Sequence, residues 1–441
     1  MAQVEADLQG RWPESRISPS LDRMRDVLHL LGDPQGTVPV VLIAGTNGKS
    51  STARMADALL RTTGLRVGRY TSPHLESVTE RISIDGKPLD DERFVEAYAE
   101  LLPYLDVVDA RHEHRLSFFE VMTVLAYAVF ADTPVDVAVV EVGLGGTWDA
   151  TNVADAQVAV VTPIALDHQE YLGDTVEEIA GEKAGIIKAG AFAVISQQSV
   201  EAAEVLLRRA AAVQATVARE GFEFGVLSRA AAFGGQQLDL KGLAGQYEGI
   251  FLPMFGAHQA HNAVVALAAV EAFLGGGADP LEDSLVRTAF AQTASPGRLE
   301  VVRRGPTVLL DAAHNPAGAQ ALARALLEDF RFDFIVGVIG IMADKDAVGI
   351  FEALEPVLSH VVVTRSSSPR AADVDELGAI AVSVFGTDRV TVTPSLPAAI
   401  DDAIALADEF GPSGSGVLVT GSVVTAGQAR TLLGPNRGDD G

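Results

Sequence analysis

Residues 40–52 constrain the fold of this chain more than any other part of the sequence. The apolar residues 40–44 predict a buried strand, Gly45 and Gly48 predict a tight turn, and the Ala-rich residues 53–61 predict a helix. In such a strand–turn–helix, backbone N–H groups point at phosphates, a lysine reaches the terminal phosphates and a hydroxyl holds Mg²⁺. The segment therefore predicts binding of ATP or GTP. The expected phosphate contacts are Gly45, Thr46, Asn47, Gly48, Lys49, Ser50 and Ser51.

The turn departs in one respect from the general phosphate-binding pattern. That pattern asks for a glycine at the position that Ile43 occupies, so the loop expected here is shorter. The strand, the lysine with its hydroxyl neighbours and the helix nevertheless agree on one structure, and this agreement favours the nucleotide site over a chance Lys-Ser sequence.

Apolar runs alternate with helical patterns along the chain, which is typical of an α/β protein with mostly parallel sheets covered by helices. The predicted strands are 40–44, 66–70, 135–142, 158–163, 192–196, 307–311, 334–341, 360–364 and 416–420. Residues 222–255 differ, because their Gly- and Gln-rich alternating runs indicate a small antiparallel patch. An Ala-rich helix is expected over 258–274.

The length of 441 residues indicates more than one domain. The small-residue stretch 293–297, which contains Pro296 and Gly297, is the expected boundary. We therefore expect a nucleotide-binding domain over 1–295 and a smaller α/β domain over 296–441. The tail 435–441 is expected to be frayed.

Composition excludes several classes of protein. The formal net charge of -26 disfavours nucleic-acid binding, which requires a basic face. The absence of cysteine excludes disulfides, thiolate metal sites and cysteine nucleophiles. Since we find neither a signal-peptide pattern nor a long apolar span, we expect a cytoplasmic protein that does not enter the membrane.

Polar residues follow three further predicted strands. Glu141 ends an apolar run and precedes Gly143, Gly145 and Gly146, and an acid at this place reaches Mg²⁺ in nucleotide hydrolases. Asp167-His168 follows the next strand and suits a second metal site. Ser72, held by Pro73, can present its hydroxyl to a metal or phosphate.

The second domain carries its own polar cluster. Asp311, His314 and Asn315 follow its first strand, and Arg298 lies just beyond the domain boundary. These positions suit an active site that closes between two domains.

Taken together, these residues resemble folylpolyglutamate synthase/dihydrofolate synthase, a branch of the Mur ligase superfamily of ATP-dependent amide ligases. The resemblance follows family order over nearly the whole chain. Its matching segments are 44–49, 71–75 with Glu80-Arg81, 117–120, 141–146, 167–168, 181–187, 261–262, 296–298, 311–316 and 420–427.

The resemblance implies an α/β fold with an N-terminal P-loop ATPase domain and a C-terminal Rossmann-like domain that binds no dinucleotide. It assigns ATP contacts to Asn262, Arg298 and Asp311 besides the P-loop, and a second Mg²⁺ site to Ser72, Glu141 and His168. Lys183 matches the lysine that family members carbamylate. The family usually has glycine where this chain has Ser50, so the first Mg²⁺ ligand is left open between Ser50 and Ser51.

The resemblance also implies where the substrates bind. Pterin contacts match Leu21, Asp22, Arg23, Ser117, Phe118, Phe119, Glu120, Trp148, Asp149 and Ala150. His314 and Ser422 match residues that handle L-glutamate. Lys49, Lys183, Asp311 and His314 are the expected catalytic residues. Stacking on the adjacent rings of Phe118 and Phe119 suits a pterin.

The implied reaction is ATP-driven amide formation through an acyl phosphate, by a monomer that acts on small molecules. The sequence leaves open whether dihydropteroate, tetrahydrofolate or both accept glutamate. A cell-wall Mur ligase would need a UDP-sugar domain before the P-loop, and too few residues precede residue 40. A degenerate ATP-binding protein would be expected to lack Lys49, Glu141 or His168, and a P-loop translocase would be expected to carry a basic stripe.

Overall fold

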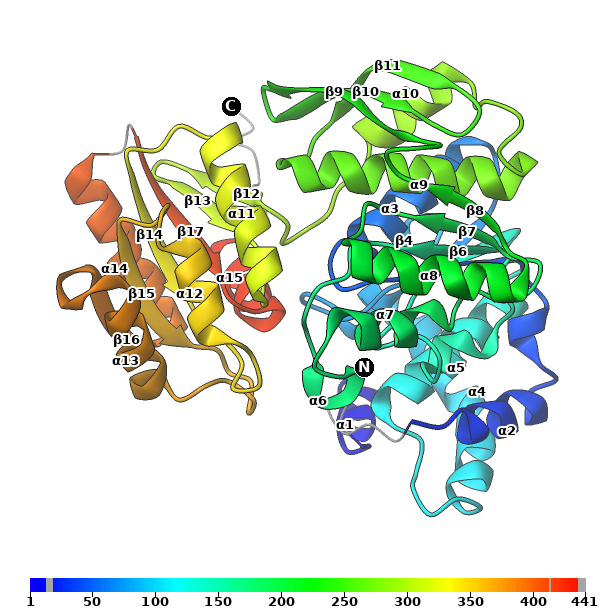
Figure 1. Ribbon diagram of the computed structural model, residues 1–441. Coiled ribbons are helices and arrows are strands. Elements are labelled where there is room, and N and C mark those ends of the chain that lie inside the picture. The colour runs from blue at the N-terminus through cyan, green and yellow to red at the C-terminus, as the bar shows by residue number, and fades with distance from the viewer. Residues whose placement is uncertain (13–18, 412–413, 435–441) are drawn as a thin grey trace. The chain divides into compact units, whose positions relative to one another are not determined.

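The computed structural model describes residues 1–12, 19–411 and 414–434, and it divides into two compact units (Figure 1). Unit 1 comprises 1–230, 237–253 and 259–293. Unit 2 comprises 294–441 together with two short earlier segments, 231–236 and 254–258. The chain therefore passes into unit 2 for the last time at Ala294, within the stretch expected to form the boundary. The tail 435–441, expected to be frayed, lies outside the described residues.

Unit 1 is built on an eight-stranded sheet of order β4-β3-β2-β5-β1-β6-β7-β8. The strands are β1 (Val40–Ala44), β2 (Val67–Tyr70), β3 (Ile82–Ile84), β4 (Lys87–Pro88), β5 (Val137–Glu141), β6 (Val158–Val161), β7 (Phe192–Ile195) and β8 (Thr216–Arg219). The strands β2, β5, β1, β6, β7 and β8 pair in parallel in this spatial order. The strands β3 and β4 add an antiparallel edge next to β2.

Helices surround this sheet. The helices of unit 1 are α1 (Ala2–Gln9), α2 (Asp22–Leu30), η1 (Pro34–Gly36), α3 (Lys49–Thr62), η2 (Val78–Arg81), α4 (Asp91–Asp109), α5 (Phe118–Asp132), η3 (Ala150–Val153), α6 (Gln169–Leu172), α7 (Val176–Ala184), α8 (Val200–Val213), α9 (Ala257–Gly275) and α10 (Asp283–Ala291). Every residue of β1 and β5 is buried, which explains why these strands are apolar on both faces.

The centre of the sheet determines where the site lies. β1 lies between β5 and β6, so Ile43 pairs with Glu141 and Ala44 pairs with Val161. Because all three strands run in parallel, the loops that follow them leave the sheet at the same edge. The phosphate-binding turn, Glu141 and the segment before His168 therefore meet there.

A separate three-stranded sheet of order β11-β10-β9 accounts for the patch expected over 222–255. Its strands are β9 (Gly225–Ala232), β10 (Gly235–Lys241) and β11 (Gln246–Leu252). Glu271 of α9 anchors it, because this buried carboxylate accepts hydrogen bonds from Tyr247 Oη at 2.6 Å and Leu243 N at 2.5 Å. Burial raises the pKa of Glu271, and the hydroxyl and amide donors partly offset that rise.

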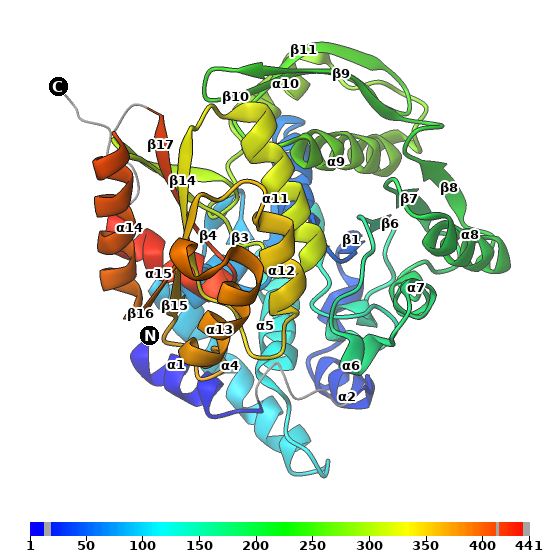
Figure 2. The same cartoon turned by 60° about the vertical axis from the view of Figure 1, so that its left-hand side comes forward.

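Unit 2 has a six-stranded sheet of order β12-β13-β17-β14-β15-β16, parallel except for the antiparallel edge strand β12. The strands are β12 (Glu300–Arg304), β13 (Thr307–Leu310), β14 (Phe334–Ile339), β15 (His360–Arg365), β16 (Val390–Ser395) and β17 (Ser415–Thr420). The helices are α11 (Pro316–Asp329), α12 (Ala347–Leu354), α13 (Val374–Phe385), η4 (Thr387–Arg389), α14 (Leu396–Phe410) and α15 (Val423–Leu433). One hydrophobic core contains side chains of α11, α12 and α13, and another contains side chains of α14 and α15. Figure 2 shows these helices beside the sheet of unit 2.

The short segment 254–258 completes the first of these cores. Phe255 packs on Phe330 with ring centroids 4.7 Å apart, and Phe330 stacks on Phe332. Gly256 N donates to Asp329 at 2.5 Å. Unit 2 therefore contains side chains that come from well before its main segment.

Some expectations need correction. The helix after the phosphate-binding turn begins at Lys49 and not at residue 53. β2 begins at Val67 and β5 spans 137–141, inside the longer runs predicted. Among the described residues, no helix is long and apolar enough to cross a membrane.

Candidate functional site

The phosphate-binding turn leaves β1 at Ala44 and enters α3 at Lys49. Gly45 has a φ of 149°, and a Cβ at this position would lie 1.9 Å from Thr162 Oγ1. Thr46 N donates to Pro163 O at 2.9 Å, which ties the turn to the loop after β6. The end of a neighbouring strand therefore sets the path of this backbone.

Gly48 is held by its conformation and by Asn262, which lies on α9. Its φ is 89°, and a Cβ there would lie 2.4 Å from Asn262 Oδ1. Asn262 is buried, and its Nδ2 donates to Gln259 Oε1 at 3.0 Å. The structure thus brings Asn262, an expected nucleotide contact, against the phosphate-binding turn.

Replacing Gly48 with Ala should disrupt this turn. The new methyl group requires both a left-handed backbone and displacement of Asn262, so we expect nucleotide affinity to fall at least about 10-fold. Isothermal titration calorimetry with ATP checks the result. Gly36→Ala is the matched control, because nothing lies within 4 Å of a Cβ at that exposed glycine. Unchanged affinity in Gly48→Ala would contradict the assignment of the turn.

Two lysines converge on one carbonyl oxygen of the turn. Lys49 Nζ donates to Gly45 O at 3.0 Å and to Thr46 O at 3.1 Å, and Lys183 Nζ donates to Gly45 O at 2.9 Å. Burial, together with repulsion from Lys49, lowers the pKa of Lys183 to about 7, although Asp167 and other carboxylates oppose this. Burial of this amine therefore favours loss of its proton near neutral pH.

Glu141 is held by two groups from other elements. Ser50 Oγ donates to Glu141 Oε1 at 2.9 Å, and Ser72 N donates to Oε2 at 3.1 Å. The carboxylate is buried, so these donors fix its orientation. Ser50, one of the two serines left open by the sequence, therefore has its hydroxyl at Glu141, and Ser51 is buried in α3.

The donors at this edge suit Mg²⁺. A carboxylate and hydroxyls are hard oxygen ligands, and Mg²⁺ usually takes one or two carboxylates and completes its shell with water and phosphate oxygens. The described part of the chain has no group of three His, Asp or Glu side chains that could hold a metal without such help. The residues therefore fit a metal that arrives with a nucleotide.

His168 lies at the start of α6 with a φ of 53°, a conformation uncommon for residues other than glycine. Its backbone N–H donates to Asp167 Oδ1 at 2.9 Å, and its Nε2 lies 3.9 Å from the same oxygen. The structure thus pairs these two residues after β6. Strained backbone of this kind is often found at functional positions.

In unit 2, Asp311 organises the loop that carries Arg298. Asp311 Oδ2 accepts from Leu299 N at 2.9 Å, and Oδ1 accepts from Ala313 N at 2.8 Å. Leu299 has a φ of 48° and is buried. Burial raises the pKa of Asp311, while Arg298 and the two amides lower it. Both carboxylate oxygens of Asp311 therefore bind backbone N–H groups, and Arg298 lies close enough to lower the pKa of Asp311.

His314 and Ser422 lie at the same edge of the unit 2 sheet. His314 Nδ1 lies 2.9 Å from Ala312 O, and because a carbonyl only accepts, Nδ1 carries the proton. Ser422 is buried and serves as the N-cap of α15, with its Oγ accepting from Thr425 N at 3.0 Å. Asn315 similarly caps α11. Ser422 therefore has a structural role, whatever contact it makes with a substrate.

The expected pterin contacts fall into three groups. Arg23 and Glu120 are both buried. Arg23 donates to Glu120 Oε1 from Nε at 3.1 Å and from Nη2 at 2.9 Å. Glu120 Oε2 also accepts from Ser117 N in the capping box of α5. Asp22 is exposed at the start of α2, next to Leu21. Arg23 and Glu120 thus join α2 to α5.

The aromatic pair Phe118 and Phe119 begins α5, directly before Glu120. Arg81 Cζ lies 4.8 Å from the centroid of the Phe118 ring. Phe119 lies 6.0 Å from the Tyr70 ring, and a Cβ at Gly143 would lie 2.4 Å from Phe119 Cζ. One face of Phe118 is therefore covered by a guanidinium, and Gly143 is small because Phe119 packs against it.

The loop 147–150 is shaped by a buried carboxylate. Asp149 accepts from Leu144 N at 2.8 Å and from Thr151 N at 3.0 Å, and it caps η3 at Ala150. Burial raises the pKa of Asp149, and the hydrogen bonds from backbone and Thr151 hydroxyl lower it. Trp148 lies beside Gly145. Asp149 thus fixes the loop from inside.

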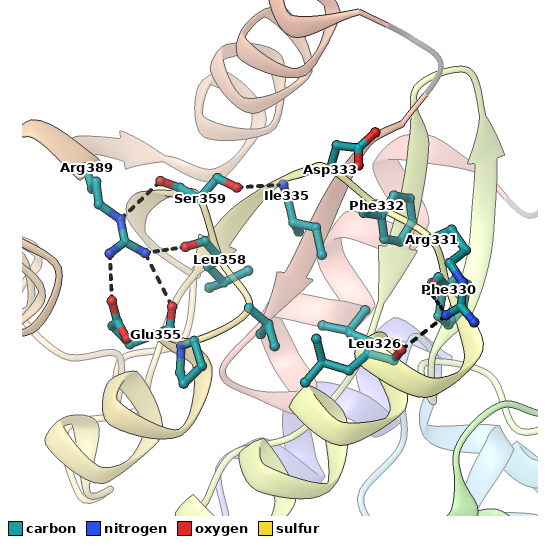
Figure 3. Close-up of a pocket in the computed structure, with 13 residues that line it drawn as sticks. Leu326, Phe330, Arg331, Phe332, Asp333, Ile335, Glu355, Leu358, Ser359 and Arg389 are labelled. Carbon is teal, nitrogen blue, oxygen red and sulfur yellow. Dashed lines mark hydrogen bonds and ion pairs between the residues drawn. The ribbon is translucent and has the colours of Figure 1, made fainter.

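Unit 2 also contains a pocket that none of the predicted site residues line. It has a volume of about 620 Å³ and is lined by apolar side chains such as Phe330 and Ile335 together with polar ones such as Arg331 and Glu355 (Figure 3). Arg389 at its rim is held by Glu355 Oε1 at 2.6 Å and by Ser359 O at 3.2 Å. Ile335 lies at the beginning of β14, so this pocket is at the opposite end of the sheet from the residues that follow β13.

Sequence analysis missed the role of some polar residues. Glu80 was noted only as part of a matching segment, yet its carboxylate accepts hydrogen bonds from the backbone of Leu75, Glu76 and Ser77. The S-x-x-E pattern of 77–80, typical of a capping box, was the available signal. Arg81, whose Nε donates to His74 Nδ1 at 2.9 Å, carried no such signal.

Comparison with known proteins decides the family. The Mur ligase middle domain matches residues 43–270, and the Mur ligase glutamate ligase domain matches 297–423. The dihydrofolate synthase/folylpolyglutamate synthase of Mycobacterium tuberculosis is 52% identical, over 98% of this chain and 94% of that protein. The chain belongs to the dihydrofolate synthase/folylpolyglutamate synthase branch of the Mur ligases. The Bacillus subtilis member of this branch is 32% identical over 95% of both chains.

Solved structures of the same branch share the fold. A structure of the M. tuberculosis folylpolyglutamate synthase complexed with ADP has a TM-score of 0.94 and 53% identity, with 98% of each chain covered. The Escherichia coli FolC structure in complex with DHPP and ADP has a TM-score of 0.86 and 30% identity, over 98% of this chain and 97% of that chain. The α/β fold predicted from the sequence is thereby confirmed.

Proposed function

We propose that this Mur ligase uses ATP to join L-glutamate to dihydropteroate and to tetrahydrofolates. One observation carries the proposal: Lys49 and Lys183 bind carbonyl oxygens of the phosphate-binding turn, and Glu141 accepts a hydrogen bond from Ser50 directly after it. This arrangement lies in a chain that matches bifunctional dihydrofolate synthase/folylpolyglutamate synthases over nearly its whole length. Relatives have been solved with ADP, with the ATP analogue AMPPCP and with DHPP.

Unit 1 supplies the phosphate site in this proposal. The backbone N–H groups of Gly48 and of the N-terminus of α3 bind the phosphates, and Lys49 leaves its carbonyl partners to contact the terminal phosphate. Bound Mg²⁺ would neutralise phosphate charge, and Glu141, Ser50 or Ser51, Ser72 and His168 are the residues that would hold it. Asn262 packs against Gly48 of the turn and is proposed to contact the nucleotide.

Lys183 is proposed to be carbamylated. Its ammonium group first loses one proton; the neutral amine then attacks CO₂, a C–N bond forms and a second proton is released, so a cation becomes an anion. The support is its burial, its low pKa and its position against the phosphate-binding turn. An anion there would also remove the repulsion between two ammonium groups that now share Gly45 O.

The proposed chemistry has two steps. A substrate carboxylate attacks the γ-phosphorus of ATP in line, which forms an acyl phosphate and releases ADP. The amine of glutamate then attacks the acyl carbon, loses a proton and expels phosphate. Phe118 and Phe119 are proposed to stack on the pterin, with the other contacts from 21–23, 117–120 and 148–150 around it. His314, Asp311, Arg298 and Ser422 are assigned to glutamate and nucleotide handling in unit 2.

The test of this function is a direct product assay. Purified protein with Mg²⁺, ATP and L-glutamate receives dihydropteroate in one reaction and tetrahydrofolate in another, and products are identified by mass. We expect each acceptor to gain a glutamyl residue with stoichiometric ADP release. If neither acceptor gains glutamate while ATP still binds, the proposal fails and a different acid substrate or a degenerate binder is indicated.

We further propose that the protein acts as a monomer in the cytoplasm on small molecules, without nucleic acid. Support comes from its acidic charge of -26, which repels nucleic-acid phosphates. Light scattering of the purified protein at micromolar concentration should give the mass of one chain. ATP turnover should not respond to added DNA or RNA.

A further inference from the structure

The loop 71–77, which follows β2, is gathered around a single carboxylate. Glu80 Oε2 accepts from Leu75 N at 2.9 Å, and Oε1 accepts from Glu76 N at 3.0 Å and Ser77 N at 2.9 Å. Three successive backbone N–H groups thus point at one anion from the same chain. Ser77 Oγ accepts from Thr79 N in return, which completes a capping box at η2.

Hydrogen bonds to an ionised acceptor are stronger than those between neutral groups, and consecutive N–H groups form a natural cradle for an anion. A loop of this length would otherwise expose its amides to water and sample many conformations. Because the accepting carboxylate is the side chain of Glu80 in the same chain, the hydrogen bonds that hold this loop need no bound ligand.

The loop 71–77 is connected both to the proposed metal ligand Glu141 and to the proposed pterin-stacking residue Phe118. At its beginning, Ser72 N donates to Glu141 Oε2 at 3.1 Å. Further along, His74 Nδ1 accepts from Arg81 Nε at 2.9 Å, and the Arg81 guanidinium lies 4.8 Å from the centroid of the Phe118 ring. The same short segment therefore contacts the proposed metal ligand Glu141 directly and the Phe118 ring through Arg81.

We propose that Glu80 is a positioning residue of the ligase reaction: by holding the amides of 75–77, it places Ser72 against Glu141 and His74 against Arg81 before substrates arrive. This inference rests on the proposed function but is tested separately from it. Glu80 touches no reacting atom in this proposal; it acts through the backbone of the loop.

The decisive variant is Glu80→Gln. A carboxamide keeps the size of the side chain, but its NH₂ group faces N–H donors in place of one accepting oxygen, so at least one of the three bonds is lost. In the substrate-free protein, hydrogen exchange at the amides of 75–77 should become at least about 10-fold faster. In the assay, kcat should fall about 10-fold, with the KM for ATP within about twofold of wild type.

Two further variants make the test specific. Glu92→Gln introduces the same chemical change at an exposed carboxylate in the first turn of α4, and it should change neither exchange nor kcat. Ser77→Ala removes the capping hydroxyl but keeps the Ser77 N–H that Glu80 binds, and it should have a much smaller effect than Glu80→Gln.

The outcomes separate this inference from the proposed function. Faster exchange with an unchanged kcat would show that the loop conformation does not matter for catalysis, and unchanged exchange would show that Glu80 does not hold the loop; either result overturns the proposal. An equal effect in Ser77→Ala would also overturn it. A wild-type protein that adds no glutamate would instead refute the proposed function, while the exchange experiment would still report on the loop.

Discussion

Lys49→Ala should abolish ATP-dependent addition of glutamate to either acceptor, with kcat/KM lower by at least about 100- to 1000-fold. In phosphoryl transfer, charge neutralisation and positioning supply most of the rate enhancement, and Lys49 is the cation at the end of the phosphate-binding turn. Product formation measured by mass, with ADP release measured in parallel, checks the prediction.

The control for this variant is Lys87→Ala, which removes an exposed lysine from the edge strand β4. This variant removes the same charge as Lys49→Ala, and we expect it to leave activity unchanged. A loss of activity in Lys49→Ala would then not be due to the changed net charge of the protein. Turnover by Lys49→Ala near the wild-type rate would refute the assignment of the phosphate site.

Lys183→Met should lower kcat by about 100-fold, because it removes the amine that we propose is carbamylated while keeping a long apolar side chain at a buried position. The carbamate itself should be pH-dependent. With the pKa of Lys183 at about 7, the ammonium form predominates at lower pH and cannot attack CO₂, whereas the free amine predominates at pH 8. ¹³C NMR after addition of ¹³C-bicarbonate should therefore show a carbamate signal that grows from pH 6 to pH 8 and is absent in Lys183→Met.

The two lysines should be coupled in this experiment. Repulsion by Lys49 is one of the causes that lower the pKa of Lys183, so Lys49→Ala should raise that pKa and move the appearance of carbamate to higher pH. If the wild-type protein shows no carbamate signal at pH 8 and Lys183→Met stays active, the carbamylation proposal is wrong, although the phosphate site could still stand.

The local part of the site could be predicted from the sequence. Gly45, Gly48 and Lys49 follow one another at a fixed spacing after an apolar strand, and Glu141 ends a second such strand. These signals are contained in short segments and need no knowledge of the fold. The start of α3 at Lys49 was still missed, because Ser50, Ser51 and Thr52 are weak helix formers whose composition hides the first turn.

The long-range part of the site could not be predicted from the residues themselves. Lys183 contacts Gly45 across 138 positions of sequence, and Arg23 contacts Glu120 across 97. Such pairs depend on the strand order, in which β1 lies between β5 and β6. Only the resemblance to a family pointed to Lys183, and even that did not indicate that it shares a carbonyl with Lys49.

The same limit applies to the division of the chain. The Pro-Gly stretch near 296 was a visible local signal, but nothing in the composition of 231–236 or 254–258 marked them as belonging to unit 2. Phe255 belongs there because its ring packs on Phe330, a contact that only the folded structure reveals.

That discontinuity has a practical meaning for anyone who dissects the protein. A gene fragment encoding only 294–441 would supply the six-stranded sheet but neither Phe255 nor the Gly256 N–H that binds Asp329. The ring of Phe330 would then be uncovered at the surface, which is a common route to insoluble product. On the ribosome, by contrast, both segments are synthesised before the sheet that they complete, so they are already available when it forms.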